Sequence, residues 1–383
     1  MENGDVLNAL WALRENYKFL ARLKFKPKAL TFMDNKFNGR PVGFNLGGWL
    51  SQSPLTEGHI ASFIQKKDFE TIAGWGFNSV RLPVDGEWLF ENDGKGQLAP
   101  QRLAFLREII GWAGEAGLLT VLDLHQVSCH SFARPELENL WKNDKDLNFF
   151  CRCWGELASA LKDVEGLLWF DILNEPTAKI SADWNKVAAR TVEAIRAEDK
   201  KRVIMVESTL WGSILKLDDL VGAIQGPNLV YSFHFYSPML VTHQQAPWWA
   251  DGKPYKDRVF YPGPIPGMEK YLAGDLTPET RAIFRFENRN WNKEALRELL
   301  RPVERLLKEG KSLYCGEFGV YERAPRETRL NWTRDVVSLF SEMKVGWGYW
   351  NYKWLDFGVW PKTPDGKTGP LDQEMLQILQ KGI

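Results

Sequence analysis

The 383-residue chain has little of the material from which disulfide scaffolds, zinc sites or membrane spans are built. Its four cysteines, Cys129, Cys151, Cys153 and Cys315, follow no framework or metal-ligand spacing, so we expect neither a disulfide core nor a zinc centre. No run of about 18 apolar residues occurs, which predicts no membrane span. The first residues are mixed and polar and do not form a signal peptide. The expected location is therefore the cytoplasm, or the outside of the cell for a mature secreted form.

The chain also lacks an excess of charge of either sign. Its 49 Lys and Arg residues balance 49 Asp and Glu residues. This balance gives no electrostatic attraction to nucleic acid or to an anionic membrane, so a neutral partner is expected. Tryptophan, in contrast, is abundant: 18 Trp outnumber 10 Tyr. A packed core accounts for most of them, but indole rings also suit the apolar faces of sugars. The sequence does not specify an oligomeric state.

Short apolar segments alternate with amphipathic helical segments from about residue 40 onward. Most of these segments are continuously apolar, which is typical of parallel strands covered by helices. Apolar residues at helical spacing predict helices over Gln101–Ala116, over Asp183–Glu198, and from Leu296 to Gly310. The pattern predicts an α/β fold, a (β/α)8 TIM barrel, with a doubly wound open sheet as the alternative. The predicted strands are Gly43–Gly47, Ser79–Leu82, Leu119–Leu124, Leu168–Leu173, Val203–Val206, Val230–Phe233, Leu313–Cys315 and Trp347–Trp350.

We expect one catalytic barrel domain over residues 36–383. A helical, basic extension over residues 1–35 is predicted to pack on its outside. The longest connection, at about residues 237–292, is rich in aromatic residues such as Trp248 and Trp249. Long insertions in barrels commonly belong to the catalytic face. Two interpretations stay open: a wall at one end of the active site that favours short substrates, or an ordinary excursion with its own small core.

Polar residues stand at the ends of most of the predicted strands. In a (β/α)8 barrel the carboxyl ends of the strands form the active-site face, so these side chains are expected to meet there. Each alone has a structural explanation, such as a barrel ion pair for Arg81, but their joint occurrence favours an active site. They are Arg81, His125, Asn174, Glu175, His234, Tyr236, Glu317 and Trp350.

Glu175 and Glu317, on the fourth and seventh predicted strands, are candidates for a catalytic pair. Cleavage of a glycosidic bond needs one carboxyl group to protonate the leaving oxygen and a second to attack the anomeric carbon or to activate water. Arg81 and Tyr236 are suited to keeping one glutamate ionised. Asn174 is suited to bonding the 2-hydroxyl of the sugar, and Trp350 to stacking on the sugar ring.

These residues and their surrounding motifs resemble glycoside hydrolase family 5, within the clan A retaining barrels, over roughly residues 40–360. The resemblance implies that Glu175 is the acid/base, that Glu317 is the nucleophile, and that no metal or cofactor is required. It also implies that Arg81, His125, Asn174, His234, Tyr236 and Trp350 line the subsite where the glycosyl-enzyme forms. The motifs are Asn45-Leu46-Gly47-Gly48-Trp49, Val80-Arg81-Leu82-Pro83, Asp123-Leu124-His125, Asn174-Glu175-Pro176, His234-Phe235-Tyr236, Gly316-Glu317-Phe318-Gly319 and Trp347-Gly348-Tyr349-Trp350-Asn351-Tyr352-Lys353.

The resemblance implies a retaining hydrolase acting on a β-glucan, with β-1,4 or β-1,3 linkages, or on its oligosaccharides. The Asn-Leu-Gly-Gly-Trp and Asp-Leu-His-Gln motifs are similar to those of exo-β-1,3-glucanases, whereas residues 126–130 lack the Pro-Gly-Ser type of run expected there. The alternatives are a β-mannanase, a glycolipid or aryl β-glycosidase, and a non-catalytic carbohydrate-binding barrel. A metal-dependent hydrolase that uses His125 and His130 is a further alternative.

Overall fold

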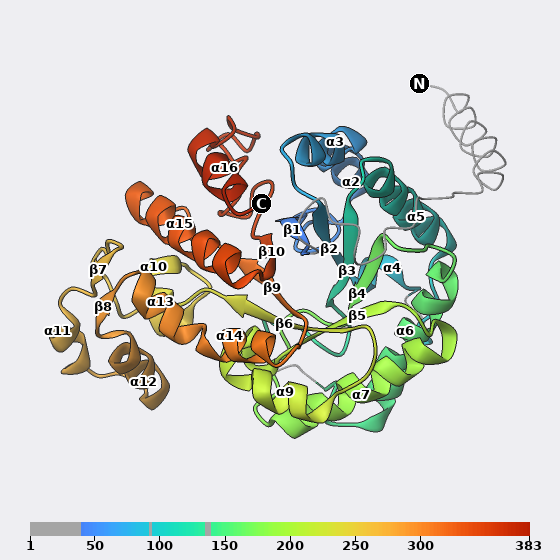
Figure 1. Ribbon diagram of the computed structural model, residues 1–383, viewed down its shortest axis with the longest axis horizontal. Helices are drawn as coiled ribbons and strands as arrows, with labels where there is room; N and C mark the ends of the chain where they lie inside the picture. Colours follow the sequence, from blue (N-terminus) through green and yellow to red (C-terminus); the bar gives the residue numbers. More distant parts are fainter. Residues whose placement is uncertain (1–39, 92–93, 135–138) are drawn as a thin grey trace.

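The computed structural model describes residues 40–91, 94–134 and 139–383, and in this part of the chain eight parallel strands close into a barrel (Figure 1). The extension predicted for residues 1–35 lies outside the described residues. Around the barrel the strands follow the order β1-β10-β9-β6-β5-β4-β3-β2. The predicted TIM barrel is confirmed, and the alternative of an open sheet is wrong. The barrel strands are β1 Val42–Asn45, β2 Ser79–Asp85, β3 Leu119–Gln126, β4 Leu168–Asp171, β5 Val203–Glu207, β6 Leu229–Phe235, β9 Leu313–Phe318 and β10 Gly346–Tyr349.

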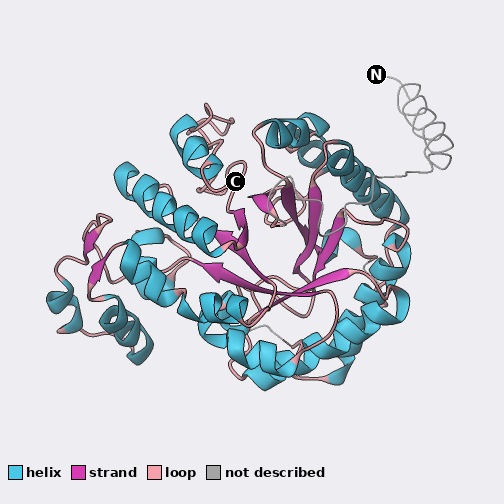
Figure 2. Ribbon diagram, in the orientation of Figure 1, coloured by secondary structure: helices cyan, strands magenta, loops and turns pink. Residues whose placement is uncertain are grey.

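Helices surround the ring of strands, as Figure 2 shows in cyan around magenta. Within the described ranges, none of them is long and apolar enough to cross a membrane. Two short 3-10 turns cover Ile214–Lys216 and Ala250–Gly252. The helices are α2 Glu57–Phe63, α3 Lys66–Gly74, α4 Gly86–Leu89, α5 Pro100–Glu115, α6 Asp144–Leu161, α7 Ser181–Glu198, α8 Thr209–Gly212, α9 Leu217–Ala223, α10 Met239–Thr242, α11 Met268–Leu272, α12 Pro278–Glu287, α13 Lys293–Leu299, α14 Arg301–Lys308, α15 Arg326–Met343 and α16 Gln373–Gln380.

Two expected boundaries differ from the structure. The predicted helix from Leu296 to Gly310 is divided into α13 and α14, because Pro302 at the start of α14 cannot continue a helix that precedes it. The second strand does not end near Arg81 but continues to Asp85. Arg81 therefore lies within β2, opposite Asn45 of β1 and Val121 of β3, and its side chain is completely buried.

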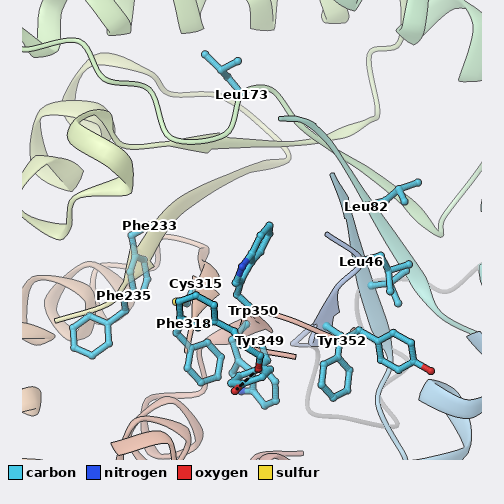
Figure 3. Packing of buried hydrophobic residues seen from close by; sticks show 14 of the residues in the cluster. Leu46, Leu82, Leu173, Phe233, Phe235, Cys315, Phe318, Tyr349, Trp350 and Tyr352 are labelled. Atoms are coloured by element: carbon cyan, nitrogen blue, oxygen red, sulfur yellow. Dashed lines mark hydrogen bonds between the residues drawn. The ribbon is translucent and has the colours of Figure 1, made fainter. Parts of the chain in front are cut away.

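The aromatic residues explain how β9 and β10 are held against α15. The Phe318 ring packs edge-on against Phe340, Trp347 and Tyr349, with ring centroids 5.3 to 5.4 Å apart. Figure 3 shows Phe318 and Tyr349 grouped together, while the indole of Trp350 projects away from them. Such edge-to-face packing holds the ends of β9 and β10 in place. The most deeply buried tryptophans, less than 2% exposed, are Trp49, Trp154, Trp184, Trp291, Trp332 and Trp347.

The long connection at residues 237–292 has two parts. Its distal part contains the two-stranded sheet of β7 (Gly263–Pro264) and β8 (Asn290–Trp291) with α11 and α12, and projects from one side of the molecule (Figure 1). Tyr255 packs there against Tyr271 and Phe284, and these rings belong to the same buried hydrophobic cluster as the barrel residues. Its proximal part, around Trp248, packs against Tyr321 of the loop after β9. The proximal part therefore contacts a loop at the carboxyl face of the barrel.

Gly43 of β1 is a position where barrel closure leaves no room for a side chain. A Cβ atom there would lie 1.7 Å from the carbonyl oxygen of Ser79 on β2. We expect Gly43→Ala to lower the free energy of unfolding by roughly 3 kcal/mol or more, because backbone would have to move. Gly74→Ala is the matched control: Gly74 ends α3 and a Cβ atom there meets nothing within 4 Å. Urea unfolding should show Gly74→Ala neutral or slightly stabilising; equal losses in both variants would contradict this account.

Candidate active site

Arg81 lies at the centre of the carboxyl face and joins residues from most of the barrel strands. Its side chain is completely buried. Its five N–H groups donate to five side chains, and a sixth side chain, Asp123, forms an ion pair with it; these six come from β1, β3, β4, the segment after β4, β5 and β9. The acceptors and their distances from the guanidinium nitrogens are Asn45 Oδ1 3.0 Å, Asp171 Oδ2 2.9 Å, Asn174 Oδ1 2.9 Å, Glu207 Oε1 3.0 Å and Glu317 Oε1 2.9 Å, and the ion-paired Asp123 Oδ2 lies 3.1 Å away.

Two of these partners of Arg81, Asp123 and Asp171, are carboxyl groups deep in the barrel. Burial raises the pKa of each well above its usual range, although the charge of Arg81 opposes the shift. Asp123 Oδ2 also lies 2.7 Å from Nδ1 of His125. Burial lowers the pKa of His125 to about 4, so its ring is neutral at neutral pH. The Nε2 atom of His125 has no hydrogen-bond partner among the described residues.

Trp350 follows β10 and forms one wall of the site. Its indole is parallel to the His125 ring, with centroids 5.7 Å apart and an interplanar angle of 4°. Gly47, after β1, allows the ring to lie close to the backbone, since a Cβ atom there would be 2.7 Å from the indole. The Trp350–Asn351 peptide bond is cis, and Asn351 bonds the carbonyl of Gly47 at 3.0 Å.

A bulge in β9 places Glu317 toward the mouth of the barrel. Phe233 of β6 pairs with Cys315, but the next residue, His234, pairs with Glu317, so Gly316 is an extra residue in β9. A side chain on Gly316 would meet the His234 ring, since its Cβ atom would lie 2.8 Å from Nε2. Glu317 Oε1 accepts from Arg81 at 2.9 Å and Oε2 accepts from the Tyr236 hydroxyl at 3.0 Å. These two contacts fix the orientation of the Glu317 carboxylate.

Glu175 enters the site from the segment after β4. His234 Nδ1 lies 2.9 Å from Glu175 Oε1 and 3.6 Å from Glu317 Oε2. Glu175, His234 and Glu317 offer one nitrogen or oxygen atom each within 4.8 Å of one another. Burial raises the pKa of Glu175 to about 7, against the opposing effect of His234. Glu175 is therefore still partly protonated at neutral pH.

Glu175, His234 and Glu317 have the spacing of a metal site, but the protonation of His234 does not suit metal binding. The ring nitrogens of His234 lie 2.9 Å from Glu175 Oε1 and 3.0 Å from Glu207 Oε1, and the surrounding carboxylates raise the pKa of His234 well above its usual value although burial opposes this. A protonated imidazole has no lone pair to offer a metal. His130, the other histidine considered as a ligand, points its Nε2 at the Asn174 carbonyl oxygen, 3.0 Å away. The absence of a metal from the reaction stays a prediction.

The structure thus brings all eight predicted site residues to one face of the barrel. It adds two carboxyl groups that the sequence interpretation missed, Asp171 and Glu207. Glu207 directly follows the apolar segment Val203–Val206, which is the same signal that singled out Glu317. Asp171 lies inside the predicted strand Leu168–Leu173, and the presence of a carboxyl group in this apolar segment could have identified it as a candidate.

A closed parallel barrel with two glutamates close together at its carboxyl face defines a (β/α)8 glycoside hydrolase. The chain belongs to the cellulase family, glycoside hydrolase family 5, whose model matches residues 38–354. The predicted family and the predicted enzyme class, a β-glucan-cleaving glycoside hydrolase, are confirmed.

Relatives and solved structures agree with this membership. The chain is 34% identical to Endoglucanase C of Acetivibrio thermocellus, with 89% of this chain and 98% of the relative covered. It is 27% identical to Cellodextrinase A of Ruminococcus flavefaciens over 80% of this chain and 84% of the relative. Among solved structures, Thermotoga maritima Cel5A in complex with cellobiose superposes with a TM-score of 0.67 at 25% identity, covering 89% of this chain and 97% of that one.

Removal of Arg81 should destabilise the whole barrel, because it would leave several buried acceptors without their cation. We expect Arg81→Ala to lower the free energy of unfolding by about 3 to 5 kcal/mol. Arg107→Ala is the control, since it removes an arginine whose partner Asp163 is largely exposed, and its loss should be below about 1 kcal/mol. Chemical denaturation of both variants measures the difference. Similar losses would show that Arg81 does not organise the fold.

Proposed function

We propose that the protein cleaves β-glucan chains internally by double displacement, with Glu175 as acid/base and Glu317 as nucleophile. The observation that carries this proposal is that atoms of Glu175 and Glu317 lie within 4.8 Å of each other. Retaining pairs are about 5 to 5.5 Å apart, whereas inverting pairs need roughly 6.5 to 9.5 Å to hold a water between them. The spacing therefore supports direct attack by a carboxylate on the anomeric carbon.

In the first step, a Glu317 oxygen attacks the anomeric carbon while the bond to the leaving sugar breaks. Arg81 and Tyr236 hold the two Glu317 oxygens in place. Burial and the negative charge of Glu317 raise the pKa of Tyr236 well above its usual value, so its hydroxyl stays protonated and continues to donate. An oriented nucleophile reduces the entropy lost on reaching the transition state.

Glu175 supplies the proton for the leaving oxygen and later removes one from the attacking water. A carboxyl group with a pKa of about 7 is protonated often enough to act as an acid at neutral pH, and once ionised it acts as a base. His234 bonds Oε1 of Glu175 through Nδ1, which leaves Oε2 to carry the transferred proton.

The sugar in the cleavage subsite would contact groups that the protein leaves available. Nε2 of His125 is available to a sugar hydroxyl group, while its Nδ1 is bonded to Asp123. Asn174 gives its side-chain oxygen to Arg81 and keeps its amide nitrogen as a donor for the 2-hydroxyl. Trp350 offers its ring face. These contacts support the roles proposed for the three residues.

Two exposed tryptophans support a polymeric substrate. Trp211 in α8 is 44% exposed, and its Nε1 donates to the Phe132 carbonyl in the loop after β3 at 3.1 Å. Trp248 is 52% exposed beside Tyr321. Indole faces at the carboxyl face suit sugar rings beyond the one that is cleaved. The relatives named endoglucanases and the bound cellobiose in the T. maritima enzyme support internal cleavage of a β-1,4-linked glucan.

Product analysis tests this proposal directly. On barley mixed-linkage glucan and cellulose oligomers, we expect early products of several lengths whose new reducing ends are first β-anomers by proton NMR. Glu317→Ala should abolish turnover, and azide should restore it with inverted glycosyl azide as product, whereas dialysis against EDTA should change nothing. Faster cleavage of mannan would favour the mannanase alternative, which a mannotriose complex of the T. maritima enzyme brings into consideration. Initial α-anomers would contradict the double displacement.

The protonation of Glu175 should be visible in the pH profile. Since the first step needs protonated Glu175, kcat/KM should be at its maximum below pH 7 and should fall as the pH rises through about 7. Glu175→Ala should remove this fall and lower kcat/KM for unactivated glucan by roughly 10² to 10⁴-fold. Dinitrophenyl cellobioside, whose leaving group needs no proton, serves as the control substrate and should lose far less. Equal losses on both substrates would contradict the acid role.

A further inference from the structure

Glu207, the last residue of β5, contacts three other groups of the site: Arg81, His234 and the backbone of Glu175. Its side chain is completely buried. Oε1 accepts from Arg81 Nη2 at 3.0 Å and lies 3.0 Å from His234 Nε2. Oε2 accepts from the backbone N–H of Glu175 at 2.9 Å. One buried carboxylate therefore contacts both the backbone of Glu175 and the histidine that bonds the Glu175 side chain.

The backbone contact acts on a strained residue. Glu175 has a φ of 47°, in the left-handed region that L-residues other than glycine rarely adopt. Such a conformation persists only where neighbouring groups hold it. The carboxylate of Glu207 offers its N–H a charged acceptor inside the barrel, where a hydrogen bond is stronger than in water. Glu207 thereby fixes the direction in which the Glu175 side chain leaves the backbone.

The second contact sets the charge of His234. The ionisable groups that face its ring are Glu175 after β4, Glu207 of β5 and Glu317 of β9, with Asp123 of β3 and Arg81 of β2 farther away. Burial alone would lower the pKa of His234, but Glu207 is first among the charges that raise it well above its usual value. Burial would likewise raise the pKa of Glu207, yet His234 and Arg81 lower it, so that the pair is ionised.

Two glycines let the backbone pack closely against His234. A Cβ atom on Gly316 would lie 2.8 Å from Nε2 of the ring. A Cβ atom on Gly212 would lie 2.8 Å from the His234 backbone nitrogen and 3.1 Å from Cγ of the ring. Gly212 follows Leu210 and Trp211, which also have positive φ values of 56° and 59°. The chain thus makes a left-handed turn that packs against His234, which lies between Glu207 and Glu175.

We propose that Glu207 is a positioning residue for the acid/base: it keeps His234 doubly protonated and holds the Glu175 backbone, so that Nδ1–H of His234 always points at Glu175 Oε1. This proposal rests on the acid/base role proposed for Glu175. When Glu175 gives its proton to the glycosidic oxygen, it becomes a carboxylate beside a fixed imidazolium that retains both of its own protons. The positive charge then stabilises the new negative charge without a second proton transfer.

NMR of protein labelled with ¹⁵N-histidine tests the charge of His234 independently of activity. The chain has five histidines, so the His234 signals can be assigned by their absence from a His234→Gln variant. In the wild type we expect both His234 nitrogens to carry protons at pH 7 and at pH 8. In Glu207→Gln, which has the same shape without the charge, we expect a neutral ring at pH 7. A neutral His234 in the wild type, or an imidazolium in Glu207→Gln at pH 8, would overturn the proposal.

Asp171→Asn provides the matched control for the loss of a carboxyl group bonded to Arg81. Asp171 is also completely buried and accepts from Arg81 at 2.9 Å, but it makes no hydrogen bond or ion pair with His234 or Glu175. The His234 signals of Asp171→Asn should match those of the wild type. If Asp171→Asn also neutralises His234, the effect follows from the loss of any carboxyl group bonded to Arg81, and the specific role of Glu207 is wrong.

Kinetics of Glu207→Gln separate positioning from folding. We expect kcat on unactivated glucan to fall on the order of 100-fold, with a much smaller loss on dinitrophenyl cellobioside, because the displaced group is the proton donor. The alkaline fall in kcat/KM should move to higher pH, since Glu175 loses the imidazolium at 2.9 Å. Equal losses on both substrates would contradict the positioning role. If Glu175→Ala itself shows no dependence on the leaving group, the proposed function fails, while the NMR result on Glu207 and His234 still stands.

Discussion

The buried guanidinium of Arg81 is the interaction on which the carboxyl face of this barrel depends. A cation without water must find partners in the protein, and Arg81 finds five hydrogen-bond acceptors and one further carboxyl group, contributed by strands on both sides of the ring. Because the guanidinium is planar and rigid, its N–H groups fix the directions of those acceptors. Glu317 and Asn174 therefore take defined positions before a substrate arrives.

The two glutamates at the mouth differ because their neighbours differ. Glu317 is bonded by Arg81 and Tyr236, whereas the largely buried side chain of Glu175 is bonded by His234. Burial disfavours an ionised carboxyl group, and the pKa of Glu175 is raised to about 7 as a result. Two identical side chains can thus take an attacking and a proton-donating role at one pH. Glu207 extends this division of roles by acting on His234.

Glycines and aromatic rings complete the geometry around these charges. Gly316 makes room for the His234 ring and Gly47 for the Trp350 ring. Behind them, Phe318 packs with the rings of α15 and β10 and holds the bulged end of β9 in place. Precise placement of reacting groups requires supporting residues that cannot move, and a dense aromatic layer provides them.

Local sequence was sufficient for the order of the strands and for most of the site. Continuous apolar segments mark buried parallel strands, and polar residues that end them are directed to one face by the architecture itself, which identified Glu175, Glu317 and Tyr236. Only the tertiary structure decided which of these residues contact one another and which of them are protonated. Arg81 and Glu317 are 236 positions apart and become partners only when the barrel closes. Likewise, the charge of His234 depends on Glu207. A pKa is set by burial and by neighbouring charges, and the local sequence determines neither of them.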